Sequence, residues 1–251
     1  MRENEFMIYI YSPSYFEEPA LIFRAVDFID TMLTPYKLEY RLTSTCYEKI
    51  ENRKEYILEK LKGESLALCN NLPDKFLHLQ GFSWEAIERL KSHAFVRTVV
   101  VVPNEEKHIN IMNSLIGGIG DTMQAYYAEV ASPGYMGEIP SSQIMFSDRT
   151  VDDILYGLPP VADFAKHGLV DYLFPRFVYW INYWSKEIAE TVDFNYERDK
   201  NLFHECFQTP SGSWVLRITK DPLDVSIPEH LELLKKVYKR YPKVGRQDLL
   251  Q

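Results

Sequence analysis

The chain has 251 residues, which suffices for one large domain or two small ones, each with its own hydrophobic core. Hydrophobic residues make up 46% and charged residues 25%, a composition that excludes a disordered chain and a fibrous one. The formal net charge is −8, yet residues 235–246 carry six positive charges and no negative one, so the rest carries −14. This negative majority disfavours binding to DNA, RNA or an anionic membrane and favours a basic partner.

The first residues and the cysteines predict a cytoplasmic protein. Acidic residues surround an apolar run of only six residues, Phe6 to Tyr11, whereas a secretory signal needs a basic start and a longer apolar stretch. No segment approaches the ~18 apolar residues of a membrane span. Cys46, Cys69 and Cys206 are widely spaced and odd in number, which favours reduced thiols over disulfides or a zinc site. We expect no metal and no cofactor.

The first forty residues predict a strand, a helix and a second strand. Apolar side chains alternate along residues 6–11 and 38–42, with the period of two that strands show. Between these segments, apolar residues over 21–33 recur at helical spacing. The start of the chain therefore has a β-α-β pattern.

The following residues repeat this pattern more loosely. The near-continuous apolar run from Phe95 to Val102 predicts a central strand that is covered on both faces. A helix begins at Asn104, and we expect Gly117, Gly118 and Gly120 to end it. The other predicted elements are a helix over about 48–62, strands near 65–69 and 76–80, a helix that is capped by Ser83 and carries Trp84, Ile87 and Leu90, and an extended segment over 122–131.

The last third of the chain predicts a hairpin between helices. The turn sequence Thr209-Pro210-Ser211-Gly212 lies between its two arms. The predicted elements are a strand from about 177 to 184, a helix over about 185–192, the hairpin arms 201–208 and 213–219, and a closing helix over about 228–240 that packs through Leu231, Leu234 and Val237.

The order of these elements predicts an α+β fold. Helices and strands do not alternate regularly, so we expect one or more mixed or antiparallel sheets with helices packed on them, built from β-α-β-like units. The chain is expected to form a single domain over 1–251. Two subdomains, at about 1–131 and 175–251, are the other possibility, joined by a Gly/Pro-rich acidic segment over 132–174.

Three catalytic or ligand-binding patterns fit poorly. The glycines at 117, 118 and 120 follow a helix, whereas a dinucleotide-binding loop follows a strand and opens a helix. His204 and Cys206 share one face of an expected strand, which hairpin packing explains without nucleophilic catalysis. The six histidines show no metal-ligand spacing.

A metal-dependent nuclease is the one enzyme alternative. Pro73-Asp74, followed thirty residues later by Glu105-Glu106-Lys107, has the outline of a PD…ExK motif, in which acids hold a divalent cation and Lys steadies the attacking water. That chemistry needs Glu and Lys at positions i and i+2 of one strand. Pro103 and Asn104 end the strand first, so Glu105 to Lys107 fall in the first turn of a helix, where acids are simply favourable. We expect no enzyme activity.

The acidic, aromatic segment around 135–174 is the strongest candidate for a binding site. Aromatic anchors within a negative field are what a tight binder of a basic protein presents. The alternative is a solvated loop whose Tyr156 and Tyr172 point inward. The residues expected to contact a protein partner are Tyr135, Asp148, Asp152, Asp153, Tyr156 and Asp163.

Several motifs in the second half resemble those of bacterial polymorphic-toxin immunity proteins, in particular the family called immunity protein fifty-two, which is found beside toxins of contact-dependent or type VI secretion systems. The resemblance spans most of the chain in length and element order, and it implies no catalytic residue. The motifs are Tyr156-Gly157-Leu158-Pro159-Pro160, Pro175-Arg176-Phe177, Trp180-Ile181-Asn182-Tyr183-Trp184-Ser185, Gly212-Ser213-Trp214-Val215-Leu216 and Tyr241-Pro242-Lys243-Val244-Gly245.

Composition and resemblance together predict a cytoplasmic immunity protein that binds and neutralises a cognate toxin. The toxin would act in the cytosol, and a basic nuclease is the natural target for an inhibitor with a negative body. The alternative is a non-catalytic adaptor or scaffold, which would bind a partner without suppressing toxicity. Neither nucleic acid nor membrane is expected as a partner, and a homodimer is left open.

Overall fold

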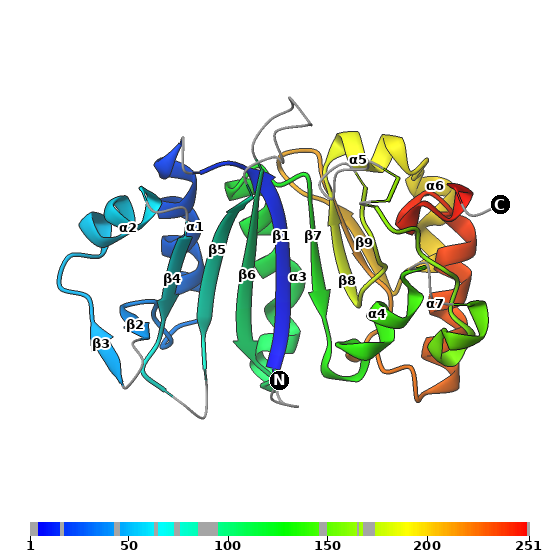
Figure 1. The fold of residues 1–251 in the computed structure, drawn as a ribbon, viewed down its shortest axis with the longest axis horizontal. Coiled ribbons are helices and arrows are strands. Elements are labelled where there is room, and N and C mark those ends of the chain that lie inside the picture. Colours follow the sequence, from blue (N-terminus) through cyan, green and yellow to red (C-terminus); the bar gives the residue numbers. More distant parts are fainter. Residues whose placement is uncertain are drawn as a thin grey trace. The chain divides into compact units, whose positions relative to one another are not determined.

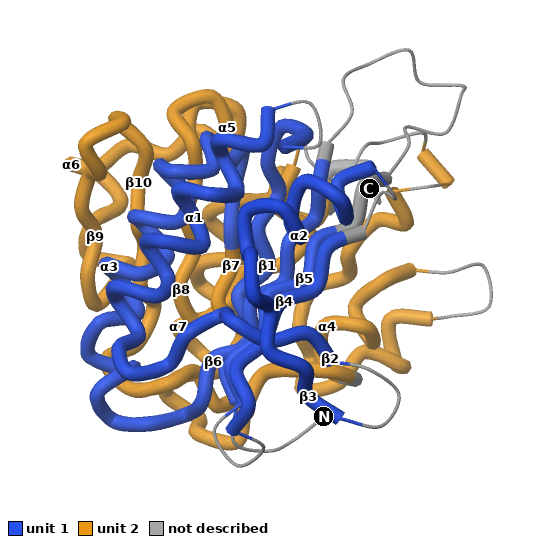
Figure 2. The backbone as a smooth tube through the Cα atoms, turned by 90° about the vertical axis from the view of Figure 1, so that its left-hand side faces the viewer, with its two compact units in different colours: residues 1–128 blue, residues 129–251 orange. Residues whose placement is uncertain are grey.

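The computed structural model has an α+β fold, as the sequence predicts. All strand pairs in its sheets run antiparallel, and the chain divides into two compact units, residues 1–128 and 129–251 (Figure 2). The division falls within strand β7 (Tyr127–Ala131), so the described part of the segment 132–174 belongs to the second unit. The structure describes residues 5–15, 18–42, 46–62, 65–72, 76–84, 95–145, 150–164, 166–167 and 174–249.

The first unit contains an antiparallel sheet with helices on one face. Figure 1 shows α1 (Pro19–Met32) and α3 (Glu106–Thr122) behind its strands, and α2 (Arg53–Leu61) is the third helix of this unit. Ile8, Ile10 and Val100 of the sheet and Ile22 of α1 are fully buried, so the core contains side chains of both layers. The strand order is β3 (Tyr47–Lys49), β2 (Tyr40–Leu42), β4 (Ser65–Cys69), β5 (His78–Trp84), β6 (Phe95–Pro103) and β1 (Glu5–Pro13).

The predicted central strand is confirmed as β6. The two strands of the initial β-α-β pattern are not neighbours in the sheet. β6 pairs with β1 on one side and with β5 on the other. β1 and β2, which flank α1 in the chain, are separated by three strands of the sheet. Alternating apolar side chains therefore identified the strands, while the strand order depended on contacts between distant segments.

Two local predictions for this unit are wrong. Ser83 and Trp84 do not begin a helix, because they pair with Val96 and Phe95 as the last residues of β5. Pairing with a neighbouring strand satisfies the backbone there and overrides the capping signal of Ser83. Ile87 and Leu90, predicted to follow in that helix, lie outside the described residues.

The glycines at 117, 118 and 120 do not end a helix, since α3 continues through them to Thr122. A Cβ on Gly118 would lie 2.0 Å from Cζ of Phe28 in α1, so only glycine leaves room for this ring. Glycine costs about 1 kcal/mol in a helix interior, and the burial of α3 against α1 offsets this cost.

The second unit has a smaller sheet than the first unit and more irregular structure. Its sheet order is β8 (Ile181–Trp184), β10 (Trp214–Arg217) and β9 (Glu205–Gln208), and β9 with β10 forms the predicted hairpin. The predicted closing helix is confirmed as α7 (Pro228–Arg240), with Leu234, Val237 and Tyr238 buried, whereas Leu231 is only half-buried. Its helices are α4 (Glu138–Gln143), α5 (Lys186–Thr191), α6 (Tyr196–Asp199) and α7 (Pro228–Arg240), with short 3₁₀ turns at Pro133–Tyr135, Val151–Asp153, Leu155–Gly157, Lys200–Leu202 and Val244–Leu249.

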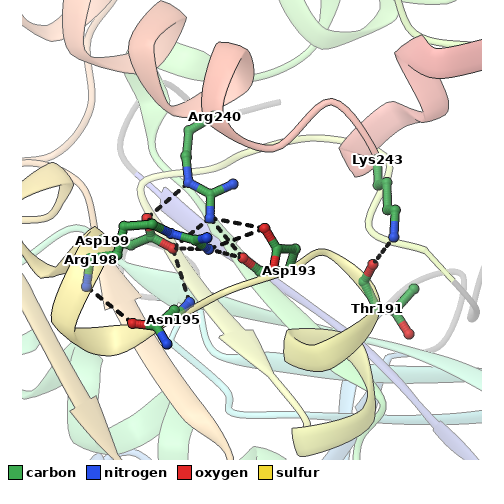
Figure 3. A network of polar contacts seen from close by, with 7 residues as sticks. All are labelled: Thr191, Asp193, Asn195, Arg198, Asp199, Arg240 and Lys243. Carbon is green, nitrogen blue, oxygen red and sulfur yellow. Dashed lines mark hydrogen bonds and ion pairs between the residues drawn. The ribbon is translucent and has the colours of Figure 1, made fainter.

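A buried carboxylate joins α6 to the end of α7 (Figure 3). The side chain of Asp199 is only 1% exposed, and it accepts hydrogen bonds from Arg240 Nε at 2.8 Å, Arg198 Nε at 3.0 Å and the Asn195 backbone N–H at 2.9 Å. Arg240 also donates to the carbonyl oxygen of Asp193 at 2.8 Å. These partners satisfy the buried carboxylate, so α6 and the end of α7 depend on the same group.

We expect Gly118→Val to destabilise the first unit. The added side chain must displace the Phe28 ring, and overpacking of this kind costs about 1–3 kcal/mol. Urea unfolding followed by circular dichroism measures the change. Ser114→Val, at an exposed position of α3, is the control for the lower helix propensity of valine alone, and equal losses in both variants would contradict the packing role.

We expect Asp199→Ala to reduce the free energy of unfolding by about 2–3 kcal/mol, because Arg240, whose side chain is 24% exposed, and the Asn195 N–H lose their charged acceptor. Glu197→Ala is the matched control, since Glu197 is 78% exposed and pairs with Lys200 at the surface. We expect Glu197→Ala to reduce the free energy of unfolding by less than about 1 kcal/mol. Similar effects of the two substitutions, measured by chemical denaturation, would show that the buried carboxylate is not a support of α7.

Candidate protein-binding surface

Two successive 3₁₀ turns, Val151–Asp153 and Leu155–Gly157, present apolar and acidic side chains together. Val151 is 60% exposed, Leu155 41% and Tyr156 49%, which is unusual for large apolar side chains. Asp152 and Asp153 are exposed beside them. Ile154 and Leu158 point inward and are buried, so they hold the turns on the second unit. We call the exposed set, Val151, Asp152, Asp153, Leu155 and Tyr156, the acidic turn.

Local hydrogen bonds fix the backbone of the acidic turn. The Asp153 carboxylate accepts from the Thr150 backbone N–H at 2.7 Å and from the Thr150 hydroxyl at 3.0 Å, which forms a capping box. The hydroxyl oxygen of Ser142, in α4, accepts from the Leu155 N–H at 3.1 Å. Each of the two 3₁₀ turns is thus held by a side chain as well as by its own backbone bonds.

Tyr156 and Gly157 both adopt the left-handed backbone conformation, with φ of 60° and 59°. Glycine adopts this conformation freely, but a residue with a Cβ pays about 1–2 kcal/mol for it. Such strain persists only where the surrounding structure holds it, and it concentrates at binding and catalytic sites. The strained backbone carries the ring of Tyr156, the half-exposed aromatic side chain of the acidic turn.

A buried polar cluster connects the acidic turn to α7. The Tyr135 hydroxyl donates to Gln143 Oε1 at 2.9 Å and lies 3.3 Å from the Tyr238 hydroxyl. Gln143 Nε2 in turn donates to the carbonyl oxygen of Pro159 at 2.9 Å, two residues beyond Gly157. The Tyr238 hydroxyl also accepts from the Val178 N–H at 3.0 Å. Helix α7 therefore holds both ends of the segment that contains the acidic turn.

The predicted contact residues differ in their exposure to solvent. Asp152, Asp153 and Tyr156 lie together on the surface, whereas Asp163 is half-buried. The assignment of Tyr135 to the surface is wrong, because this side chain is fully buried. Its hydroxyl is bonded to Gln143 and lies beside the Tyr238 hydroxyl, and its ring centroid lies 5.6 Å from that of Tyr179. Asp148 and Tyr172 lie outside the described residues.

Val151 and Leu155 are the members of the acidic turn that sequence reasoning missed. They are exposed, whereas their neighbours Ile154 and Leu158 are buried. The four apolar residues have the i, i+3, i+4, i+7 spacing of a single helix face, which would place all four on the same side, so the pattern does not separate the exposed pair from the buried pair. Their position among acidic residues was the only available signal.

The remaining sequence motifs form no catalytic arrangement in the described part of the chain. Lys107 Nζ lies 3.0 Å from Glu105 Oε2, and the Tyr36 hydroxyl donates to both oxygens of this carboxylate, at the start of α3. Asp74, the other acid of the nuclease outline, lies outside the described residues. Burial raises the pKa of the Cys206 thiol to about 12, so at neutral pH the reactive thiolate is scarce.

Among the residues that the structure describes, no group of three or more His, Cys, Asp or Glu side chains is placed to hold a metal ion. Of the helices that the structure describes, none combines the length and the apolar character needed to cross a lipid bilayer.

Comparison with known families gives a match over most of the chain. Residues 22–248 match the family described as a domain of unknown function, DUF5953. The chain belongs to the DUF5953 family. This match does not test the resemblance to immunity protein fifty-two. No curated protein matches the sequence.

The fold of this DUF5953 chain also occurs in a solved structure. That structure is the type VI secretion system (T6SS) protein PA0821 of Pseudomonas aeruginosa, with a TM-score of 0.54 and 12% sequence identity. The match covers 95% of this chain and 74% of the other. At this identity the likeness is one of fold.

The buried tyrosines predict that this DUF5953 chain loses stability in alkali. Burial raises the pKa of Tyr238 to about 12 and that of Tyr135 well above its usual value of 10.0. In the unfolded chain these tyrosines ionise near pH 10, so their stabilising contribution is complete below pH 10 and is lost as the pH rises through the folded-state pKa. Between pH 9 and pH 11, we expect Tyr238 to account for about 1 kcal/mol of lost unfolding free energy.

Urea unfolding at pH 9 and pH 11 tests this dependence in the wild type and in Tyr238→Phe. The variant lacks the ionisable hydroxyl, so its loss over this interval should be smaller by the amount due to Tyr238. Tyr196→Phe is the control, because Tyr196 is 37% exposed. An equal loss of unfolding free energy between pH 9 and pH 11 in the wild type and in Tyr238→Phe would contradict the prediction.

Proposed function

We propose that this chain is an immunity protein of a type VI secretion system, which neutralises a cognate toxin by tight protein–protein association and catalyses no reaction. The observation that carries the proposal is the acidic turn, where a strained, half-exposed tyrosine lies between exposed aliphatic and acidic side chains. The fold shared with a type VI secretion protein and the resemblance of motifs to the immunity protein fifty-two family support the same function.

The composition of the acidic turn is that of an interface centre with a charged rim. Tyrosine is enriched among the few side chains that supply most of the binding energy, since it joins a large apolar face to a polar tip. Val151 and Leu155, which precede Tyr156 in the sequence, add exposed apolar area to the acidic turn. Asp152 and Asp153 would pair with basic groups of the partner and speed its approach.

The charge of the chain supports a basic target in the cytosol. Outside residues 235–246 the chain carries −14, so its field attracts a positively charged enzyme over a distance of about 8 Å at physiological salt. A basic nuclease is the target that we propose, and the chain would act in the cytoplasm. An inhibitor of a lethal enzyme requires a very low dissociation constant, and the tightest known complexes reach about 10⁻¹³ M or below.

The test begins with the genes on either side of the one for this chain, among which we expect one that encodes a toxin-like protein. Co-expression of the wild-type chain should restore growth of bacterial cells that produce the toxin, and the purified proteins should bind in biolayer interferometry. Binding without protection would indicate an adaptor. Absence of both binding and protection would refute the proposal.

Tyr156→Ala locates the interface. We expect the dissociation constant of the toxin complex to rise about thirtyfold or more, because loss of a central anchor costs about 2 kcal/mol or more. Leu58→Ala, at a 40% exposed position of α2, is the control and should change the affinity less than about twofold. Unchanged affinity in Tyr156→Ala, with retained protection, would place the interface elsewhere.

A further inference from the structure

A positively charged face of α7 lies beside the acidic turn. Lys235, Lys236 and Lys239 occupy the side of the helix opposite its buried residues, and we call these three the lysine face. Lys235 pairs with Glu232 at 3.5 Å within the helix. Lys236 and Lys239 are exposed, and neither forms an ion pair with another described residue. The charges of Lys236 and Lys239 are therefore available to a second molecule.

The lysine face and the acidic turn are contiguous. A Cβ on Gly157 would lie 3.9 Å from Lys235 Nζ, so the residue after Tyr156 touches the edge of the lysine face. Both patches belong to the second unit, where the bonds of Tyr238 to Tyr135 and Gln143 fix α7 against the segment that carries the acidic turn. The surface thus presents one negative and one positive patch side by side.

We propose that two copies of this chain form a twofold-symmetric dimer in which the acidic turn of each copy contacts the lysine face of the other. A twofold interface uses the same surface on both copies and must complement itself. Two adjacent patches of opposite charge meet this condition, because a half-turn about an axis between them brings each patch onto its opposite. Val151, Leu155 and Tyr156 supply apolar area at the centre of this interface.

The charges favour a second copy over a polyanion as the occupant. DNA, RNA or an anionic membrane would meet the lysine face together with Asp152 and Asp153, which repel phosphates. The overall repulsion between two chains of −8 is screened beyond about 8–10 Å in salt, whereas pairs that touch are screened much less. The proposal concerns the free protein and does not rest on the proposed toxin, although a toxin bound at the acidic turn would compete with the second copy.

Charge reversal in two separate variants tests the dimer by sedimentation equilibrium. Asp152→Lys places like charges opposite the intact lysine face, and Lys236→Glu/Lys239→Glu places like charges opposite the intact acidic turn. Each variant alone should dissociate at least about tenfold more readily than the wild type. An equimolar mixture of the two variants should form a heterodimer with an affinity near that of the wild type, because each contact then joins opposite charges.

The controls change the same charges elsewhere on the second unit. Glu190→Lys and Lys186→Glu alter two exposed residues of α5, and both should dimerise as the wild type does. Circular dichroism verifies the fold of every variant. Dissociation of the wild-type dimer should also increase with salt.

Three results would overturn the dimer. The first is a wild-type chain that stays monomeric at the highest attainable concentration, which leaves the proposed function intact if the chain still protects cells. The second is a dimer that neither variant weakens. The third is a set of lysine variants that lose affinity for a short DNA duplex while their self-association is unchanged, which would assign the lysine face to nucleic acid.

Discussion

The hydrogen bonds of Gln143 with Tyr135 and Tyr238 are the contact on which the second unit depends. Between β7 and β8, the described residues form short helices, turns and one isolated bridge between Ile144 and Val161, so regular backbone bonding satisfies few of their polar groups. Gln143 accepts from Tyr135 and donates to Pro159, and it thereby joins the stretches of chain that precede and follow the acidic turn. Tyr238 joins the same cluster from α7, a helix with a strong apolar face. A regular element thus determines the position of a segment that has little regular structure of its own.

The same support explains how a strained tyrosine remains on the surface. Holding Tyr156 in the left-handed conformation costs free energy that the turn by itself does not recover. Ile154 and Leu158 are buried on either side of Tyr156, and Ser142 holds the N–H of Leu155. A ring presented in this way loses little conformational entropy when a partner binds, which raises affinity without an additional contact. The backbone of the acidic turn is thus held by buried contacts on both sides of Tyr156.

In the second unit, the structure places charges of opposite sign next to each other. The sequence shows a negative body and a positive stretch near its end, which as bulk quantities concern solubility and long-range attraction. The structure places Lys235, within that stretch, beside Gly157 of the acidic turn. Neighbouring patches of opposite sign fix the orientation of a bound partner, because a rotated partner brings like charges together. Asp199 shows the other use of charge in this unit, since its buried carboxylate binds Arg198 and Arg240 and stabilises α7 internally.

The sequence by itself determined the elements whose signals are local and periodic. Alternation along β1, the apolar run of β6 and the helical spacing of α7 predicted these elements, and the acidic aromatic composition identified Asp152, Asp153 and Tyr156. Where a local signal conflicts with packing, the tertiary structure decided which element forms. Phe28 explains why α3 continues through Gly118, and pairing with β6 keeps Ser83 in a strand. In the irregular segment no period distinguishes inside from outside, so only the contacts with Gln143 and α7 bury Tyr135 and leave Tyr156 exposed.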